Sequence, residues 1–243
     1  MKTLVIVPSK QRPEVFEKYT KPFITNLGLD SLLILEKEDY DNYNFNNKLE
    51  LEESDMGIGY ALLHGKKYAE KHGYELIFKI DDDVKEIGNI KDDLEEIYKQ
   101  MANNPEISAV GFPYSFQFYD KSEQLFTHIN KRLQTCYIIK TKSFTPKTEI
   151  STFEDFSQFL HIIQRGEKTL YCARHMIKCK PVGGGKGGCQ CFDRRKQAEK
   201  EIKIFNQIDP SVGFIVKENK PWYYEPKFSD KRYKAIKLKS SLP

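Results

Sequence analysis

The sequence predicts an α/β fold, built on a largely parallel sheet with helices on both of its faces. Short apolar runs alternate with segments of helical periodicity along the first half of the chain, which is typical of repeated βαβ units. The clearest runs are residues 4–7 and 32–35, each continuously apolar as in strands buried on two faces. With no clean linker along its 243 residues, the chain is expected to form a single domain.

The first half divides into strands and helices in a regular order. A loop at residues 8–13 follows the first strand and leads into a helix over residues 13–27. The second strand ends at Glu36, and the polar residues 37–51 look irregular. Apolar residues at helical spacing then predict two further helices, whose buried faces are Ile58, Ala61, Leu62, Gly65, Tyr68 and Ala69 and then Leu94, Ile97, Tyr98 and Met101. Strands are expected at residues 75–80 and 107–112.

The second half is more mixed. Residues 112–126 are rich in aromatic side chains, and residues 135–140 resemble a strand. A helix that begins near Phe153 has Phe156, Phe159, Leu160 and Ile163 on one face and ends at Gly166. The remaining segments are a strand at 169–173, a glycine-rich run at 183–188, a charged helix at 192–208 and a lysine-rich tail at 227–239.

The composition suits a soluble protein with a sizeable core. Apolar residues make up 39% of the chain and aromatic residues 13%, which argues against disorder. The 39 Lys and Arg residues against 35 Asp and Glu give a net charge of +4, compatible with a polyanionic partner without requiring one. The apolar run before Pro8 is too short for a signal peptide or a membrane span. We therefore expect a cytoplasmic protein with no membrane partner.

The five cysteines do not form a recognisable framework. They are Cys136, Cys172, Cys179, Cys189 and Cys191, and their odd number argues against a set of disulfides. Four of them cluster in sequence with His175, so a zinc site is an alternative, but the spacing matches no usual pairing of zinc ligands. Reduced thiols are the expectation.

Three consecutive aspartates, Asp81, Asp82 and Asp83, follow the strand at residues 75–80. Crowded carboxylates repel one another, and a bound divalent cation is the usual remedy. If the strand geometry continued, Asp81 and Asp83 would share one side as ligands for Mn²⁺ or Mg²⁺, and Asp82 would face the other. The alternative is a solvated turn with aspartates that cap a helix.

Polar residues follow three of the predicted strands. The loop at 8–13, Glu36 and the aspartate triplet all stand at carboxyl ends of strands, the edge at which open α/β sheets bind ligands. Lys10 and Arg12 in that loop are placed to meet a diphosphate, although an isolated basic pair is more often a solvated loop. The sequence therefore predicts a ligand site at this edge of the sheet.

Further candidates lie in the second half. Glu154 and Asp155 begin a helix, where carboxylates are favoured by the helix dipole and where one could also serve as a general base for a hydroxyl nucleophile. His175 is a candidate further metal ligand, with a structural histidine as the alternative. Lys186, within the glycine-rich run, could approach a phosphate from a lid, or that run could be a plain surface loop.

In this order the motifs resemble those of the GT-A-fold glycosyltransferases. Residues 5–13 look like the opening strand and loop of that family, and residues 80–83 look like its DxD metal motif, preceded by a Gly/Ala-containing helix at 57–72. Residues 153–155, followed by Phe159-Leu160 and Arg165-Gly166, resemble the ED helix of its inverting members. The resemblance covers residues 3–173 and implies a GT-A-type, Rossmann-like sheet.

The resemblance also implies a role for each matching residue. Residues 1–112 would form the half that binds the nucleotide sugar, expected to be a UDP-sugar, and residues 113–243 the half that binds the acceptor. Pro8, Arg12 and Glu36 would border the base and ribose, with Asp82 near the ribose or sugar. Asp81 and Asp83 would hold the diphosphate through Mn²⁺ or Mg²⁺, and Asp155, with Glu154 as its alternate, would deprotonate the acceptor. The loop departs from the common form at residues 9–11, and Glu36 stands where Asp is more usual.

The compact size, the glycine-rich segment before a charged helix and the composition rich in Lys, Asn and Tyr are similar to those of phage-encoded enzymes that transfer a hexose or pentose to 5-hydroxymethylpyrimidines in DNA. This similarity implies 5-hydroxymethylcytosine in double-stranded DNA as the acceptor and the host cytoplasm as the location. Lys131-Arg132, residues 194–196 and the C-terminal lysines could neutralise phosphates, and the aromatic residues at 112–119 could stack on an extruded base. Core packing and solvated charges are the alternatives for these residues.

Three other functions remain open. A glycosyltransferase of the same fold could act on a surface glycan or a protein, and a nucleotidyltransferase can also combine such a sheet with acidic metal ligands. A DNA-binding accessory protein is a non-enzymatic possibility. It fits the aspartate triplet poorly, because three carboxylates without a metal would repel phosphate.

Overall fold

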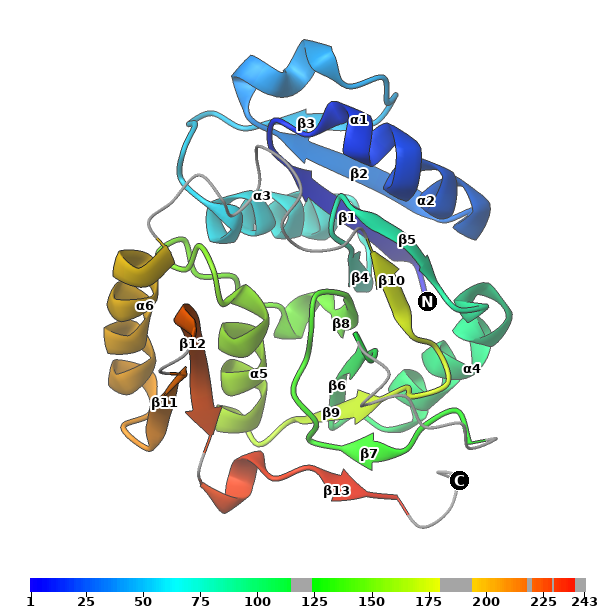
Figure 1. Cartoon of the computed structure of the whole chain (residues 1–243). Coiled ribbons are helices and arrows are strands. Elements are labelled where there is room, and N and C mark those ends of the chain that lie inside the picture. Colours follow the sequence, from blue (N-terminus) through cyan, green and yellow to red (C-terminus); the bar gives the residue numbers. More distant parts are fainter. Residues whose placement is uncertain (115–123, 180–193, 218–219, 229, 239–243) are drawn as a thin grey trace.

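A nine-stranded sheet forms the centre of the computed structural model, which describes residues 1–114, 124–179, 194–217, 220–228 and 230–238 (Figure 1). From one edge to the other its strands are β13 (Ile236–Lys237), β7 (His128–Ile129), β9 (Lys168–Tyr171), β6 (Ile107–Gly111), β8 (Tyr137–Lys140), β4 (Leu76–Lys79), β1 (Thr3–Ser9), β2 (Asp30–Leu35) and β3 (Lys48–Glu50).

The sheet is mixed and mostly parallel. β1 pairs in parallel with β2 and β4, and β2 pairs in parallel with β3. β8 lies antiparallel between β4 and β6, so β4 and β6 run the same way, and β9 runs parallel to β6. Only β8 and β7 are reversed within this described sheet. The predicted α/β fold in a single domain is therefore confirmed.

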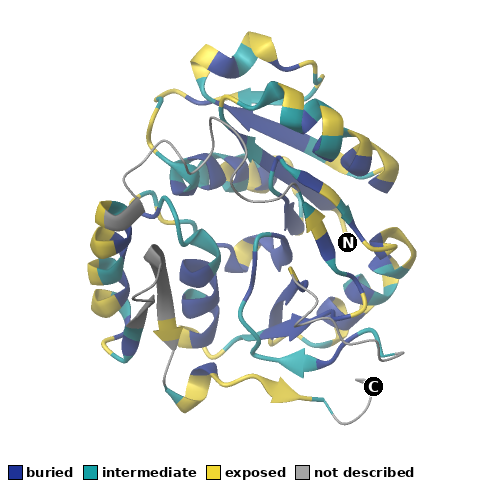
Figure 2. Ribbon diagram, in the orientation of Figure 1, coloured by how far each residue is buried: buried dark blue, intermediate teal, exposed yellow. Residues whose placement is uncertain are grey.

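Helices cover both faces, and the alternation of side chains along β1 explains why. Val5 and Val7 pack into one core cluster, with Phe16, which follows α1 (Pro13–Val15), and with α2 (Lys21–Leu27) and α4 (Ile90–Asn103). Leu4 and Ile6 face the other cluster, with α3 (Ile58–Lys71), α5 (Glu154–Gln164) and α6 (Arg194–Ile208). The central strands are accordingly buried along their length (Figure 2).

Several elements differ in detail from the prediction. The first helix is interrupted by a π-helical turn, η1 (Phe16–Thr20), and the polar segment after β2 forms a 3₁₀ helix, η2 (Lys37–Asn42). A further 3₁₀ helix, η4 (Thr141–Ser143), follows β8. Two strand pairs lie outside the main sheet: β5 (Val84–Ile87) with β10 (Ile177–Cys179), and β11 (Val212–Lys217) with β12 (Lys220–Phe228). The tail expected only as a lysine-rich run contains part of β12, the 3₁₀ helix η6 (Lys231–Tyr233) and β13.

The described residues contain three free cysteines, no group of side chains that could hold a metal alone and no helix that could cross a membrane. Cys136, Cys172 and Cys179 are free thiols there, and Cys189 and Cys191 lie outside the described ranges. Among those same ranges, no three His, Cys, Asp or Glu side chains are grouped closely enough to hold a metal by themselves. No helix in the described part of the chain is long and apolar enough to cross a membrane.

The start of α3 lies directly against the loop that precedes α5. The Gly59 N–H donates to the carbonyl oxygen of Ile150 at 3.1 Å. A Cβ at Gly59 would overlap the carbonyl oxygen of Lys147 and come within 2.6 Å of that of Ile150, both of them backbone atoms that cannot rotate away. Glycine at this position therefore permits the close approach of the two segments.

Replacing Gly59 tests this contact. Gly59→Ala is expected to lower the free energy of unfolding by about 1–3 kcal/mol, because the added methyl group forces two backbone segments apart. Urea denaturation measures the loss. Gly213→Ala in β11 is the matched control, since a Cβ there has nothing nearer than 3.9 Å. Equal effects of the two substitutions would contradict the proposed contact.

Candidate active site

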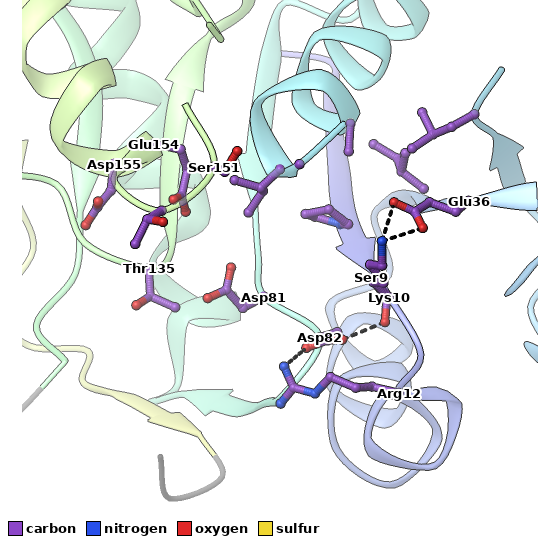
Figure 3. A pocket seen from close by; sticks show the side chains of 17 residues that line it. Ser9, Lys10, Arg12, Glu36, Asp81, Asp82, Thr135, Ser151, Glu154 and Asp155 are labelled. Carbon is purple, nitrogen blue, oxygen red and sulfur yellow. Dashed lines mark hydrogen bonds and ion pairs between the residues drawn. The ribbon is translucent and has the colours of Figure 1, made fainter. Parts of the chain in front are cut away.

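A cavity of about 260 Å³ opens at the carboxyl ends of β1, β2 and β4 and is bordered by the starts of α3 and α5 (Figure 3). Eight of the residues singled out from the sequence line it: Pro8, Lys10, Arg12, Glu36, Asp81, Asp82, Glu154 and Asp155. They come from segments more than 140 residues apart in the chain. The edge of the sheet predicted to bind a ligand is thus where the structure has its cavity.

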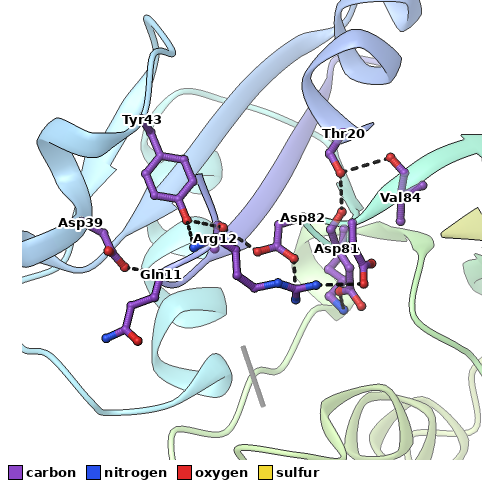
Figure 4. A network of polar contacts seen from close by, with 11 residues as sticks. Gln11, Arg12, Thr20, Asp39, Tyr43, Asp81, Asp82 and Val84 are labelled. Carbon is purple, nitrogen blue, oxygen red and sulfur yellow. Dashed lines mark hydrogen bonds and ion pairs between the residues drawn. The ribbon is translucent and has the colours of Figure 1, made fainter. Parts of the chain in front are cut away.

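A chain of hydrogen bonds shapes the loop after β1 (Figure 4). The Arg12 N–H donates to the Tyr43 hydroxyl at 2.9 Å, which lies 2.7 Å from the Ser9 hydroxyl. Ser9 in turn donates to an Asp82 carboxylate oxygen at 2.6 Å. The Gln11 N–H, at a residue with a left-handed φ of 54°, donates to Asp39 at 2.7 Å. Side chains of η2 and the triplet therefore fix the loop on one side of the cavity.

Arg12 is the shared counter-ion of two aspartates. Its guanidinium lies 2.9 Å from Asp82 Oδ1 and 3.1 Å from Asp83 Oδ2. Burial nevertheless raises the pKa of Asp82 to about 7, since the guanidinium and Ser9 offset only part of the lost hydration. Burial and the charge of Asp81 also raise the pKa of Asp83.

The triplet does not continue the strand geometry. β4 ends at Lys79, and the backbone turns so that the Val84 N–H donates to the Asp81 carbonyl oxygen at 3.4 Å. Thr20 of η1 stabilises that turn, because its hydroxyl donates a hydrogen bond to the same carbonyl oxygen at 3.1 Å. As a result Asp81 and Asp82 line the cavity, whereas Asp83 is not among its lining residues and pairs with Arg12. Because β4 ends before the triplet, strand alternation does not describe these side chains, and the assignment of Asp81 and Asp83 as joint metal ligands stays a prediction.

A residue that the sequence analysis overlooked lies under the cavity. Lys79, the last residue of β4, is fully buried, and its ammonium group contacts Asp81 Oδ1 at 2.5 Å and Glu154 Oε1 at 2.8 Å. The Thr135 carbonyl oxygen accepts its third bond at 2.9 Å. Burial alone would lower the pKa of Lys79, but the two carboxylates raise it well above its ordinary value. A lysine inside an otherwise apolar strand was the signal available in the sequence.

Asp155 faces the cavity from the first turn of α5. Its Oδ1 accepts from the Phe156 N–H at 2.9 Å. Burial and the neighbouring charge of Glu154 raise the pKa of Asp155 to about 7, although Arg132 and Lys79 act in the opposite direction. A carboxyl group that titrates near neutrality is suited to proton transfer.

Another overlooked carboxylate holds the loop before α5. Glu201, buried on α6, accepts from the backbone N–H groups of Ser151, Thr152 and Phe153 at 2.7, 2.9 and 3.0 Å. Ser151 and Thr152 line the cavity. Sequence patterns do not reveal this contact, because its partners are backbone groups about 50 residues away.

Lys10 and Glu36 lie at the end of the cavity away from Asp155 (Figure 3). The Lys10 ammonium lies 2.7 Å from Glu36 Oε2, and it also pairs with Asp55. Glu36 Oε1 accepts from the Asp55 N–H at 2.9 Å. This end of the cavity thus offers one cation and one carboxylate at fixed positions.

His175 and Phe112 are not among the residues that line the cavity. His175 is buried beside Gly88, and its Nε2 lies at hydrogen-bond distance, 2.7 Å, from a carboxylate oxygen of Asp93 in α4. Lys186 lies outside the described residues. Phe112, one of the aromatic residues suggested for base stacking, is buried in the core, with its ring 5.9 Å from that of Phe78. Phe116, Phe118 and Tyr119 lie outside the described residues.

The donor set of the cavity fits a divalent cation that is shared with a ligand. Asp82 and Asp83 pair with Arg12, Asp81 and Glu154 share the ammonium group of Lys79, and Arg132 acts electrostatically on Asp155. Asp81 lines the cavity and is one third exposed. Mg²⁺ and similar ions usually take one or two carboxylates and fill their other positions with water and substrate phosphates. Asp81 is the residue placed to supply such a ligand.

Comparison with solved structures identifies the fold. A mycobacterial protein matches with a TM-score of 0.56 and 9% identity, covering 93% of this chain and 83% of that one. GalNAc-T7, solved with UDP, GalNAc and Mn²⁺, matches with a TM-score of 0.55 and 12% identity over 74% of this chain. The chain has a GT-A-like fold. It spans 44% of the length of GalNAc-T7. No protein-family model and no curated protein matches the sequence.

The raised pKa of Asp82 predicts a pH dependence of stability. A carboxyl group whose pKa rises from 3.8 unfolded to about 7 folded stabilises the protein fully below pH 4, and that contribution disappears as the pH rises through 7. Asp82→Asn removes the titration, so wild type should lose up to about 4 kcal/mol relative to this variant between pH 4 and pH 8. Urea unfolding across that range measures the difference. Asp41→Asn, at an exposed aspartate of η2, is the control, and a pH-independent difference for Asp82→Asn would refute the assignment.

Proposed function

We propose that the protein is a metal-dependent glycosyltransferase that transfers a hexose or pentose from a UDP-sugar to a hydroxyl acceptor, with inversion at the anomeric carbon. One observation carries the proposal. A single cavity at the carboxyl edge of a GT-A-like sheet holds a candidate metal ligand, Asp81, and a candidate base, Asp155. The likeness to GalNAc-T7, which was solved with UDP and Mn²⁺, supports the choice of donor and metal.

The donor half of the site would be built by the loop after β1 and the ends of β2 and β4. Pro8, Lys10 and Glu36 border the end of the cavity assigned to the base and ribose. Asp82, bonded to Ser9 and Arg12, would set the shape of the wall beside the ribose and sugar. Asp81, with Asp83 as the second candidate, would hold Mn²⁺ or Mg²⁺ against the diphosphate. The bound metal would stabilise the negative charge that develops on the leaving diphosphate.

Asp155 is the better candidate for the base. Glu154 is committed to the Lys79 ammonium at 2.8 Å, whereas Asp155 has a pKa raised to about 7. In the proposed step Asp155 accepts the proton of the acceptor hydroxyl as its oxygen attacks the anomeric carbon. The bond to the diphosphate oxygen breaks on the opposite face, so the configuration inverts.

Our first choice of acceptor is 5-hydroxymethylcytosine in double-stranded DNA, which would place the protein in the cytoplasm of the host. Two neighbouring cations, Lys131 and Arg132, support an acceptor that carries phosphate groups. Arg132 acts electrostatically on Asp155, so this positive charge lies near the proposed base. Both cations also pack on aromatic rings, of Phe156 and Tyr171. A glycan or protein acceptor is the main rival. A nucleotidyltransferase of similar fold would instead release pyrophosphate from a nucleoside triphosphate.

The donor assignment predicts ligand-dependent stability. UDP with Mn²⁺ at about 100 times the dissociation constant should add about 2.7 kcal/mol, which raises the melting temperature by roughly 5–10 °C. Asp81→Asn should lose the part that depends on Mn²⁺, and Asp41→Asn should retain it. Thermal denaturation measures both. If UDP has no effect at any Mn²⁺ concentration, the donor site is wrong.

The base assignment predicts separate effects on binding and turnover. Asp155→Asn should reduce sugar transfer at least about 100-fold, while UDP and Mn²⁺ still stabilise the protein. In wild type the rate should rise with pH as Asp155 ionises through about pH 7. The assay incubates hydroxymethylated DNA with a panel of UDP-sugars and weighs the digested nucleosides.

The same assay separates the rival functions. Near-normal turnover of Asp155→Asn would show that another group is the base. An unchanged nucleoside mass across the whole panel would favour a glycan or protein acceptor. Pyrophosphate released from a nucleoside triphosphate would favour nucleotidyl transfer.

A further inference from the structure

The ammonium group of Lys79 lies where three oxygen acceptors meet beside the cavity. Its ammonium group has three N–H bonds and three acceptors: Asp81 at 2.5 Å, Glu154 at 2.8 Å and the Thr135 carbonyl oxygen at 2.9 Å. Two of the acceptors are carboxylates that line the cavity. The lysine itself has no exposed surface.

This arrangement neutralises the carboxylate with the clearest access to the cavity. Asp81 is 33% exposed, yet one of its oxygens already holds a full positive charge at contact distance. Arg12 does the same for Asp82 and Asp83. A divalent cation arriving alone would therefore meet carboxylates that already have counter-ions, and a cation 4–5 Å from the ammonium would also be repelled by it.

A second lysine of the same sheet has a different set of contacts. The ammonium of Lys140, in the neighbouring strand β8, contacts the carbonyl oxygens of Pro105 and Asn104 at 3.0 and 3.4 Å, while Glu167 and Glu106 act on it electrostatically. Lys79 by contrast contacts two carboxylates that line the cavity.

We propose that Lys79 is a positioning residue that serves as the resident counter-ion of Asp81 and Glu154, and that it prevents the free protein from binding a divalent cation by itself. The cation then enters only together with the diphosphate of the nucleotide, whose oxygens supply the missing ligands. This second part rests on the proposed function. The first part concerns the free protein and holds or fails independently of any sugar donor.

The experiment titrates the free protein with Mn²⁺ alone, following the loss of the free-ion electron paramagnetic resonance signal. Wild type should show no saturable binding below roughly 1 mM. Lys79→Gln, which keeps a polar side chain but removes the charge, should bind one Mn²⁺ at least about tenfold more tightly. The double variant Lys79→Gln with Asp81→Asn should lose that site. Lys140→Gln is the matched control for the loss of a buried lysine and should behave as wild type.

Two results would overturn the proposal. One is saturable Mn²⁺ binding by wild type well below that concentration, and the other is a folded Lys79→Gln protein that gains no site. If Lys79→Gln does not fold, saturable Mn²⁺ binding by wild type still overturns the proposal. Adding UDP to wild type then separates the two proposals. Mn²⁺ binding that appears only with UDP supports both, and the absence of binding with UDP contradicts the proposed donor site alone.

Discussion

The buried contact of Lys79 with Asp81 and Glu154 is the interaction on which the candidate site depends. It joins the end of β4 to the start of α5, two points 75 residues apart in the chain. Removing either carboxylate would leave a buried charge poorly compensated, which is far more costly than losing a surface ion pair. The contact therefore sets both the position of α5 relative to the sheet and the charge presented to the cavity.

Two other contacts work in the same way around the cavity. Glu201 holds the loop before α5 through three successive N–H groups, and Arg12 holds the triplet through two aspartates. Each is a buried or half-buried charge with more than one partner, so each fixes the relative position of segments distant in sequence. The proposed halves, residues 1–112 and 113–243, share one sheet because β8 inserts between β4 and β6. The cavity lies where their elements meet.

Much of the fold was predictable from local patterns. The continuous apolar runs of β1 and β2 and the helical spacing in α3, α4 and α5 are signals within a few residues, and they give the correct elements. The convergence of Pro8, Glu36 and Asp81 followed from a topological rule about the carboxyl ends of parallel strands. The sequence pattern predicts β8 as a strand. Its antiparallel direction depends on its neighbours β4 and β6 and cannot be inferred from its own residues.

The site was predictable only in part, because several of its side chains are positioned by partners far away in the sequence. The aspartate triplet was found because charge crowding is visible in a sequence, but its orientation was not, since the strand ends at Lys79, before the first aspartate. Lys79 and Glu201 depend on partners 75 and about 50 residues away. Histidine is a common metal ligand, but the ring of His175 lies at hydrogen-bond distance from Asp93 of α4.

The most direct test of the account is anomalous diffraction from crystals grown with Mn²⁺ and UDP. We expect one Mn²⁺ peak within about 2.0–2.2 Å of an Asp81 carboxylate oxygen and of a diphosphate oxygen, with the nucleoside directed toward Glu36. A nucleotide bound outside the cavity, or a Mn²⁺ peak with no contact to Asp81, would contradict it.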